Sequence, residues 1–253
     1  MLSLQKVSAG YDGRRVLFEV SFTLDKGERL AVIGPNGCGK TTLLRAIMGM
    51  IPSEGTVLLD GKKLSQYPKR DLARRIAMLS QITQLYFDYT VYDTVMLGRY
   101  PHHGGRLLWG ESEEDRQAVA QALALVRLDE LRQRTLSTLS GGQLQRVFVA
   151  KVLAQQPDII LLDEPTNHLD LSYQVELIDF LRQWSQQNQK SVIGVLHDMN
   201  LALRLTDRVL LLNAGKPQAL GSASELLGAR ELLQGVYGMD VVGYMRDSLK
   251  RWE

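Results

Sequence analysis

The sequence predicts an α/β fold in which a mixed sheet has antiparallel strands at the N-terminus and is interrupted by a helical insertion. Three observations support this. Apolar residues alternate through the first thirty positions. Four short apolar runs, "LAVI", "IILL", "SVIGVL" and "VLLL", follow from residue 29 onward. Between residues 81 and 156 strand-like runs disappear. Strands buried on both faces read as continuous apolar runs, and helices between them make the connections that parallel pairing requires.

The N-terminal alternation predicts antiparallel strands with one buried face. Its apolar positions are Leu2, Leu4, Phe18, Val20, Phe22 and Leu24. In the insertion, "SEEDRQAVAQALALV" begins with a Ser-x-x-Asp cap at Ser112. Its apolar positions Val119, Ala122, Leu123 and Val126 share one helical face. We therefore expect a single domain over 1–253, with an α/β core from 1–80 and 157–253 and a helical subdomain over 81–156.

Composition indicates an ordinary globular protein. The chain has 253 residues, of which 45% are apolar and 23% charged. A formal net charge of +2 is too small to indicate a nucleic-acid partner, and the basic pairs at 62–63, 69–70 and 74–75 are expected to be solvated. The single cysteine excludes an internal disulfide. No apolar run approaches the roughly 18–20 residues of a spanning helix, and the N-terminus lacks a signal-peptide core, which predicts a cytoplasmic protein.

The stretch "LAVIGPNGCGKTTLLRAIMG" predicts a phosphate-binding loop. A buried strand precedes Gly34-x4-Gly39-Lys40-Thr41 and an apolar-faced helix follows, which is the context that separates a P-loop from a chance glycine-rich turn. Backbone N–H groups and the helix N-terminus can then bind phosphate. We expect Lys40 to neutralise the β- and γ-phosphates and Thr41 to ligate Mg²⁺. The candidate ATP-binding residues are Asn36, Gly37, Cys38, Gly39, Lys40, Thr41 and Thr42.

Cys38 lies inside this loop, where small residues are tolerated. We interpret it as a packing or spacing residue. A redox role is the alternative, and it would require an exposed thiol.

Two carboxylates end the next buried run, "PDIILLDEPTNHLD". Asp163 is the candidate for holding Mg²⁺, and Glu164 the candidate general base for the attacking water. The alternative for Glu164 is a solvated acid at a strand end. Together with the loop, these residues predict a P-loop NTPase core.

Two further polar residues follow apolar runs. His197 ends "SVIGVLH"; a lone histidine is usually structural, but at a strand end of a P-loop domain it can reach the γ-phosphate and the water. Asp198 and Asn200 are expected to cap the helix that follows. Gln81, after "IAML", is a candidate Mg²⁺ ligand and catalytic residue, although it is uninformative in isolation.

The stretch "TLSGGQLQR" contains two glycines that a helix start does not explain. Ser140 and Gln143 form a capping-box pattern before an apolar-faced helix. Gly141 and Gly142, however, each cost a helix interior roughly 1 kcal/mol. The pair therefore indicates that something approaches the backbone closely.

Together these motifs resemble the nucleotide-binding subunit of an ATP-binding-cassette transporter, over essentially the whole chain. "LSGGQ" at 139–143 is the most specific of them. The resemblance implies that Tyr11 stacks on adenine, that Gln81 senses metal and permease, and that Asp170 belongs to an inter-subunit loop. It also implies that Asp163 is the metal carboxylate, that Glu164 is the base and that His197 is the switch histidine.

The same resemblance implies a head-to-tail homodimer. Ser140, Gly141 and Gly142, with Gln143, would close over the γ-phosphate held in the P-loop of the second copy. One chain carries one P-loop and one such stretch, so two copies would share two ATP sites.

A finer resemblance is to the importer ATPases for iron–siderophore complexes, haem and cobalamin. It is carried by "TVYDTVMLGRYPH" at 90–102, "NHLD", "LHDMNLA" and "VYGMDV". It implies a separate membrane permease, indirectly a substrate-binding protein, and a place at the cytoplasmic face of the membrane. Leu144 and Lys151 depart from the usual arginines, and "GGRLLWGES" carries no chemistry that we can assign. The alternatives are an exporter ATPase and a non-transport ABC protein; a GTPase is disfavoured because Asn-Lys-x-Asp is absent.

Overall fold

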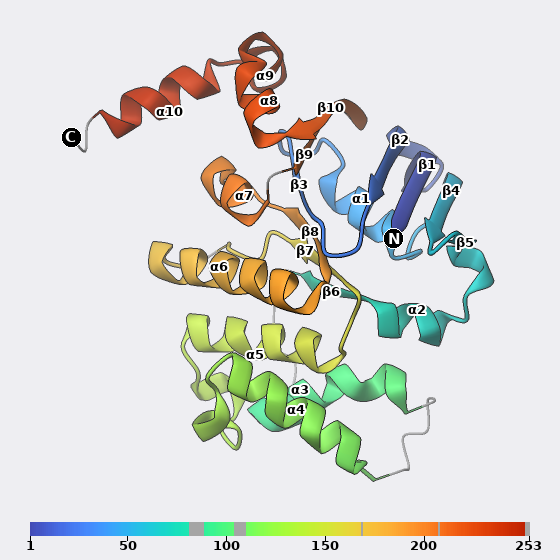
Figure 1. The fold of residues 1–253 in the computed structure, drawn as a ribbon, viewed down its shortest axis with the longest axis vertical. Helices are drawn as coiled ribbons and strands as arrows, with labels where there is room; N and C mark the ends of the chain where they lie inside the picture. The colour runs from blue at the N-terminus through green and yellow to red at the C-terminus, as the bar shows by residue number, and fades with distance from the viewer. Residues whose placement is uncertain (81–88, 104–109, 168, 207, 251–253) are drawn as a thin grey trace.

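A computed structural model describes residues 1–80, 89–103, 110–167, 169–206 and 208–250, which form two β-sheets surrounded by helices (Figure 1). The antiparallel sheet has the order β2 (Arg14–Leu24), β1 (Leu2–Tyr11), β4 (Ser53–Leu59) and β5 (Lys62–Lys63). The predicted antiparallel N-terminal strands are therefore confirmed.

The buried face of β2 changes part-way along the strand. Val20, Phe22 and Leu24 are buried as predicted, but Leu17 is buried and Phe18 is only partly so. A bulge explains the change: the register with β1 shifts between Val20 and Leu17, and Glu19 has a φ of 50°. An extra residue in one strand breaks the two-residue period, so alternation alone misplaces Phe18.

The second sheet has the order β10 (Lys216–Ser222), β9 (Arg208–Asn213), β3 (Arg29–Ile33), β8 (Ser191–Val195), β7 (Ile159–Asp163) and β6 (Ile76–Ser80). All neighbouring strands are parallel except β10. The carboxyl ends of β3, β7 and β8 therefore meet at one edge. The residues that follow these three strands are the predicted site residues of the P-loop, Asp163–Glu164 and His197.

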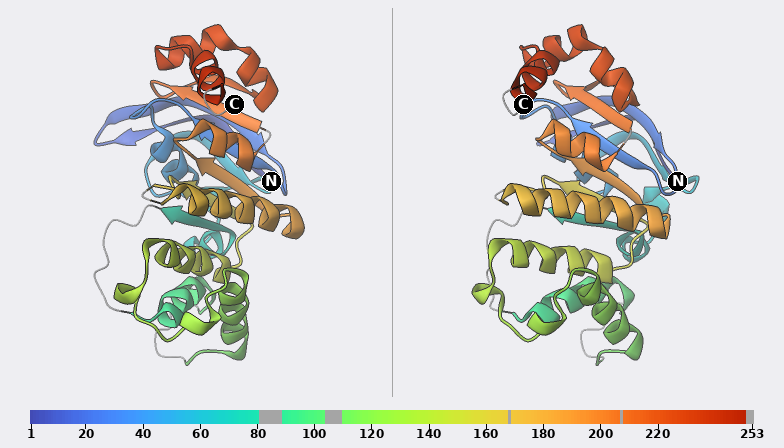
Figure 2. Two further views of the ribbon diagram at one scale, coloured as in Figure 1. Left: turned by 90° about the vertical axis from the view of Figure 1, so that its left-hand side faces the viewer. Right: turned by 60° about the vertical axis from the view of Figure 1, so that its left-hand side comes forward.

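Helices surround the parallel sheet and extend below it (Figures 1 and 2). Described residues 89–103 and 110–158 contribute helices and no strand to either sheet. Ser112 and Asp115 form the predicted capping box at the start of α4. The helices are α1 (Lys40–Ile47), α2 (Lys69–Arg75), α3 (Val91–Met96), α4 (Glu113–Leu125), α5 (Gly141–Ala154), α6 (Leu171–Asn188), α7 (Met199–Leu205), α8 (Ala223–Gly228), α9 (Arg230–Tyr237) and α10 (Val241–Leu249), with 3₁₀ helices η1 (Leu64–Gln66), η2 (Leu97–His102), η3 (Asp129–Leu131) and η4 (Leu136–Thr138).

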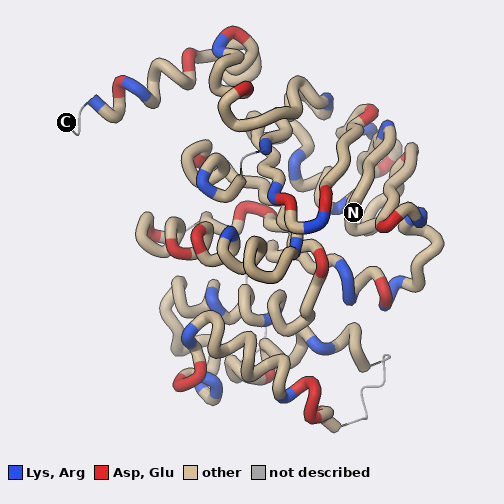
Figure 3. Tube along the Cα trace, in the orientation of Figure 1, with Lys and Arg blue, Asp and Glu red and all other residues tan. Residues whose placement is uncertain are grey.

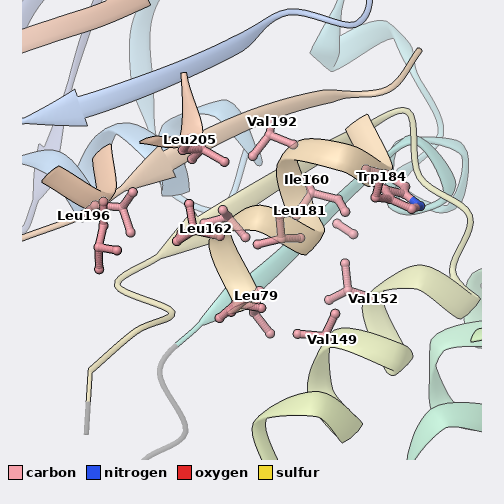
Figure 4. Packing of buried hydrophobic residues seen from close by; sticks show 14 of the residues in the cluster. Leu79, Val149, Val152, Ile160, Leu162, Leu181, Trp184, Val192, Leu196 and Leu205 are labelled. Atoms are coloured by element: carbon pink, nitrogen blue, oxygen red, sulfur yellow. The ribbon is translucent and has the colours of Figure 1, made fainter. Parts of the chain in front are cut away.

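Apolar clusters cover both faces of the parallel sheet. On one face, Leu30 and Leu161 pack with α1 and the antiparallel sheet. On the other, Ile160 and Leu162 pack with α5, α6 and α7 (Figure 4). Successive residues of β7 thus enter opposite clusters, which explains why its sequence is apolar without alternation.

We expect Leu162→Ala to lower the free energy of unfolding by about 2–5 kcal/mol, because Leu162 is fully buried and its loss leaves a cavity. Urea unfolding measures the change. Leu171→Ala is the matched control, since Leu171 is 71% exposed and its truncation should change stability by about 0.5 kcal/mol or less. Equal losses for the two variants would contradict this assignment of the core.

Charges of both signs are interspersed over the molecule (Figure 3). Most of the basic pairs lie at the surface, but the prediction of a solvated Arg75 is wrong. Its guanidinium binds Asp158 at 2.7 Å and Asp60 at 2.5 Å, and so joins the end of α2 to the turn after β4 and to the residue before β7. Among the described helices, none is both long and apolar enough to cross a lipid bilayer.

Candidate functional site

The loop between β3 and α1 has a shape that only glycine permits. Gly34 has a φ of 150°, and a Cβ there would overlap the carbonyl oxygen of Leu212. Gly39 caps α1 with a φ of 104°. L-residues with side chains rarely adopt these angles. The loop therefore turns tightly enough to leave the N-terminus of α1 facing open space.

A cavity of about 350 Å³ lies at this loop. It brings together Lys40 and Thr41 from the start of α1, Glu164 from the end of β7 and His197 from the end of β8. This meeting follows from the strand order, because the three strands are adjacent and parallel. The remaining lining residues are Val16, Asn36, Gly37, Gly39 and Thr42.

Lys40 is held inside the loop. Its ammonium donates to the carbonyl oxygens of Gly34 and Pro35, at 2.8 and 3.0 Å, and the residue is only 5% exposed. Both of these hydrogen-bond partners are neutral carbonyl groups, so neither neutralises the charge of the buried ammonium. The loop thus holds a positive charge at a cavity where an anion can enter.

Thr41 and Asp163 form the second polar contact of the site. The Thr41 hydroxyl donates to Oδ1 of Asp163 at 2.8 Å. Burial raises the pKa of Asp163, the hydrogen bond from Thr41 opposes that rise, and the nearby Glu164 carboxylate adds to it. A divalent cation would offset both the cost of burying the charged Asp163 carboxylate and its repulsion by Glu164. Paired hydroxyl and carboxylate oxygens suit Mg²⁺, which binds through few protein ligands together with water and phosphate.

Glu164 is fixed from three directions. Its N–H donates to Val195 at 3.0 Å, and its backbone has a φ of 52°, a region that non-glycine residues rarely occupy. Its carboxylate lies 2.6 Å from Nε2 of His197 and accepts from the Asn167 amide at 2.7 Å. Such strained, over-determined residues cluster at functional sites. Sequence reasoning missed Asn167, although its spacing of three from Glu164 within "EPTN" was a usable signal.

His197 lines the cavity and contacts Glu164, and its side chain is 38% exposed. His197 thus lies at the cavity and not in the core, and its contact with the γ-phosphate stays a prediction. Asp198 caps α7 by accepting from the N–H groups of Asn200 and Leu201, as predicted. Asn200 lies inside the helix and donates to that cap, so its own capping role was wrong.

Ser140 and Gln143 form the predicted capping box at the start of α5. A Cβ on Gly142 would lie 2.9 Å from the Tyr173 ring, so packing within the chain accounts for this glycine. Gly141 has open space around its α-carbon. None of the residues 139–143 lines the P-loop cavity, so the structure does not bring the two motifs together within one chain.

Tyr11, Asp170 and Gln81 lie outside this constellation. Tyr11 is 36% exposed at the end of β1, and its hydroxyl accepts from Arg45 of α1 at 3.1 Å. Asp170 caps α6 through the N–H of Tyr173 at 3.0 Å. Gln81 is outside the described residues. Contacts of these three with nucleotide, metal or partner remain predictions.

Cys38 is a packing residue in this structure. It is 4% exposed, and burial raises the pKa of its thiol, which disfavours the reactive thiolate.

Burial likewise raises the pKa of Tyr237, at the end of α9, to about 12, with the Cys38 sulfur and the Gly34 N–H beside the phenol. Sequence reasoning did not find that the C-terminal helices reach the base of the loop.

Comparison with known proteins gives the family. Residues 17–167 match the model of the ABC transporter family, well over half of the chain. The chain belongs to the ABC transporter family. It therefore binds ATP and is an ATPase of the kind that drives transport.

Two relatives cover nearly all of this ABC ATPase. A hemin import ATP-binding protein of Pseudomonas aeruginosa is 42% identical over 96% of the chain and 94% of the relative. A ferric enterobactin transport ATP-binding protein of Escherichia coli is 39% identical over 93% of the chain and 86% of the relative.

Two solved structures share the fold. An inward-facing, putative metal-chelate type ABC transporter superposes with a TM-score of 0.81 at 30% identity, covering 94% of this chain and 88% of that one. A dimeric ATP-binding cassette in a post-hydrolysis state, bound to ADP and Pi, superposes with a TM-score of 0.74 at 28% identity, covering 88% and 98%. The predicted ABC fold is confirmed.

Proposed function

We propose that this chain is the ATP-hydrolysing subunit of an importer that carries a metal chelate, an iron–siderophore complex or haem, or cobalamin, through a separate membrane permease. The hemin and ferric enterobactin relatives and the metal-chelate type structure support the substrate class. The "LGRYPH" stretch of η2, which resembles these importer ATPases, agrees with it. The permease would hold the subunit at the cytoplasmic face of the membrane, and a substrate-binding protein would deliver the cargo to the permease.

The observation that carries the ATPase assignment is the convergence of Lys40, Thr41, Glu164 and His197 on one cavity. The N–H groups of residues 36–42 and the Lys40 ammonium would bind the phosphates. Thr41 and Asp163 would hold Mg²⁺, with Gln81 as a further ligand. When bound, Mg²⁺ neutralises charge on the phosphates.

Glu164 would accept the proton of the attacking water at its carboxylate. His197, 2.6 Å from that carboxylate, is placed to orient the base and to contact the γ-phosphate. Asn167 would hold the other carboxylate oxygen, and each oxygen has a second lone pair that can accept the proton. Tyr11 would stack on adenine.

We propose that the working form is a head-to-tail homodimer. Ser140, Gly141, Gly142 and Gln143 lie away from the P-loop cavity of their own chain, and Gly141 exposes its backbone at a helix N-terminus. Such an N-terminus favours an anion. These residues would therefore close over the ATP of the second copy, with Asp170 in the interface. Residues 81–156, which carry this motif, would form a helical subdomain beside the core of residues 1–80 and 157–253.

Purification from membranes of the native source tests the transport assignment. We expect an integral membrane protein to co-purify with the tagged chain, and haem or a ferric siderophore to stimulate ATP hydrolysis by the reconstituted complex. The Glu164→Gln chain is the control, because it should recover the same partner without stimulated hydrolysis. Stimulation by a substrate moving outward would favour the exporter alternative, and recovery with ribosomes or DNA would favour a non-transport ABC protein.

A further inference from the structure

Side chains of η2 bind the C-terminal end of α5. The last carbonyl groups of a helix lack partners inside it. Arg99 donates to the carbonyl oxygen of Ala154 at 2.9 Å, and Nε2 of His102 lies 3.0 Å from that of Gln155. A cationic side chain at a helix C-terminus also complements the helix dipole. We call this set of contacts the α5 junction.

The backbones of the two helices also meet directly. A Cβ on Gly98 would overlap the carbonyl oxygen of Lys151, so η2 and α5 approach as closely as a glycine allows. The orientation of α5 thus depends on where η2 lies.

Arg99 is immobilised in this junction. It is fully buried, its Nε donates to Asp115 at 2.8 Å, and the nitrogen that binds Ala154 also reaches Gln156 at 3.0 Å. Asp115 is itself fixed by the Ser112 hydroxyl and by His103, whose Nε2 is 3.1 Å away. One guanidinium therefore joins η2, α4 and α5, using a planar fork of donors that a lysine does not have.

The junction is also attached to α2, beside the sheet. The Gln155 side chain donates to the carbonyl oxygens of Ala73 and Ile76 at the end of α2. Arg70 and Arg74 of α2 donate to Pro101 and His102 of η2 at 2.7 to 3.2 Å. The end of α5 is thus attached to the core both directly and through η2.

The other end of α5 carries Ser140, Gly141 and Gly142. The helix has 14 residues and is about 21 Å long at about 1.5 Å per residue. A tilt of about 3° about the junction therefore moves the N-terminus by about 1 Å. A misplacement of about 1 Å can cost as much as 10²-fold in rate.

We propose that Arg99 is a positioning residue for ATP-driven closure: by fixing the end of α5 against the core, it sets where Ser140–Gly142 meet the nucleotide of the second copy. This rests on the proposed head-to-tail dimer. Arg99 lies far along the helix from the nucleotide-contacting end and acts only through α5.

The test uses Arg99→Lys in the full chain carrying Glu164→Gln, so that ATP binds without turnover. Lysine keeps the charge beside Asp115 but loses the fork that reaches α5. We expect the ATP concentration for half-maximal dimerisation, followed by light scattering, to rise roughly tenfold, the worth of a hydrogen bond to a charged group. Binding of a fluorescent ATP analogue to the monomer should stay within about twofold, because the P-loop is untouched.

Arg116→Lys in the same background is the matched control. Arg116 lies on α4 in an exposed pair with Glu113 and should leave dimerisation unchanged. Gln155→Ala is the second variant, because it cuts the direct link to α2 without leaving a buried charge unpaired. It should shift dimerisation in the same direction as Arg99→Lys.

The results separate the inference from the function on which it rests. If the Glu164→Gln parent does not dimerise with ATP, the proposed dimer is wrong. If the parent dimerises and both Arg99→Lys and Gln155→Ala do so at the same ATP concentration, with only lower melting temperatures, Arg99 has a purely structural role and the inference is overturned.

Discussion

Replacing Glu164 with Gln is expected to lower ATP turnover by about 10²–10⁴-fold while ATP still binds, which is the usual worth of a general base. The amide has the size of the carboxylate and can still accept a hydrogen bond from the side-chain amide of Asn167. It cannot accept the proton of water. The nucleotide contacts of the P-loop are unchanged. Bound ATP should therefore persist, and the variant should accumulate as an ATP-bound dimer.

Steady-state phosphate release and sedimentation with ATP measure the two effects. Glu113→Gln is the control, because Glu113 is an exposed carboxylate on α4 and its loss should leave both unchanged. Turnover within a few-fold of the parent would remove Glu164 from the role of base. Slow turnover without a trapped dimer would support Glu164 as the base and contradict the ATP site shared between two copies.

Replacing Lys40 with Met is expected to weaken ATP binding by about 10²-fold and to abolish hydrolysis. The side chains are similar in length, but the variant loses the ammonium that the loop holds in the cavity, and hydrogen bonds to charged groups are worth about 1.5–3 kcal/mol each. The carbonyl oxygens of Gly34 and Pro35 also lose the hydrogen bonds from the ammonium, so the loop itself should become less stable.

Equilibrium binding of a fluorescent ATP analogue gives the affinity, and thermal melting without nucleotide reports the loosening. Lys26→Met serves as the control, since Lys26 lies in an exposed turn away from the cavity. An unchanged affinity would show that Lys40 does not face the phosphates.

Local patterns predicted much of the site. The strand–glycine–lysine–helix pattern located the P-loop, and the ends of apolar runs located Glu164 and His197. The structure brings these residues to one cavity because the carboxyl ends of adjacent parallel strands meet at one edge of a sheet, and their roles stay predictions. The capping boxes at Ser112 and Ser140 were likewise predictable, since a cap depends on residues three positions apart.

Other features could not be predicted in this way. The bulge at Glu19 breaks a two-residue period, so alternation placed Phe18 on the buried face where the structure has Leu17. Sequence reasoning explained Gly142 only by the approach of a partner and did not find the Tyr173 ring, thirty-one positions away, which also leaves too little space for a side chain there. Arg75 was expected in solvent because its two carboxylate partners are distant in sequence.

By itself, the amino-acid sequence determined the class of fold, the phosphate loop and the order of the reactive groups along the chain, because these follow from short patterns of burial, turn geometry and capping. Only the tertiary structure decided that His197 contacts Glu164, that Asn167 donates a hydrogen bond to the same carboxylate, and that Arg99 binds the end of α5. Such contacts depend on how strands are ordered and how helices pack across the sheet. Packing joins residues without regard to their separation in the chain, so no local pattern encodes it.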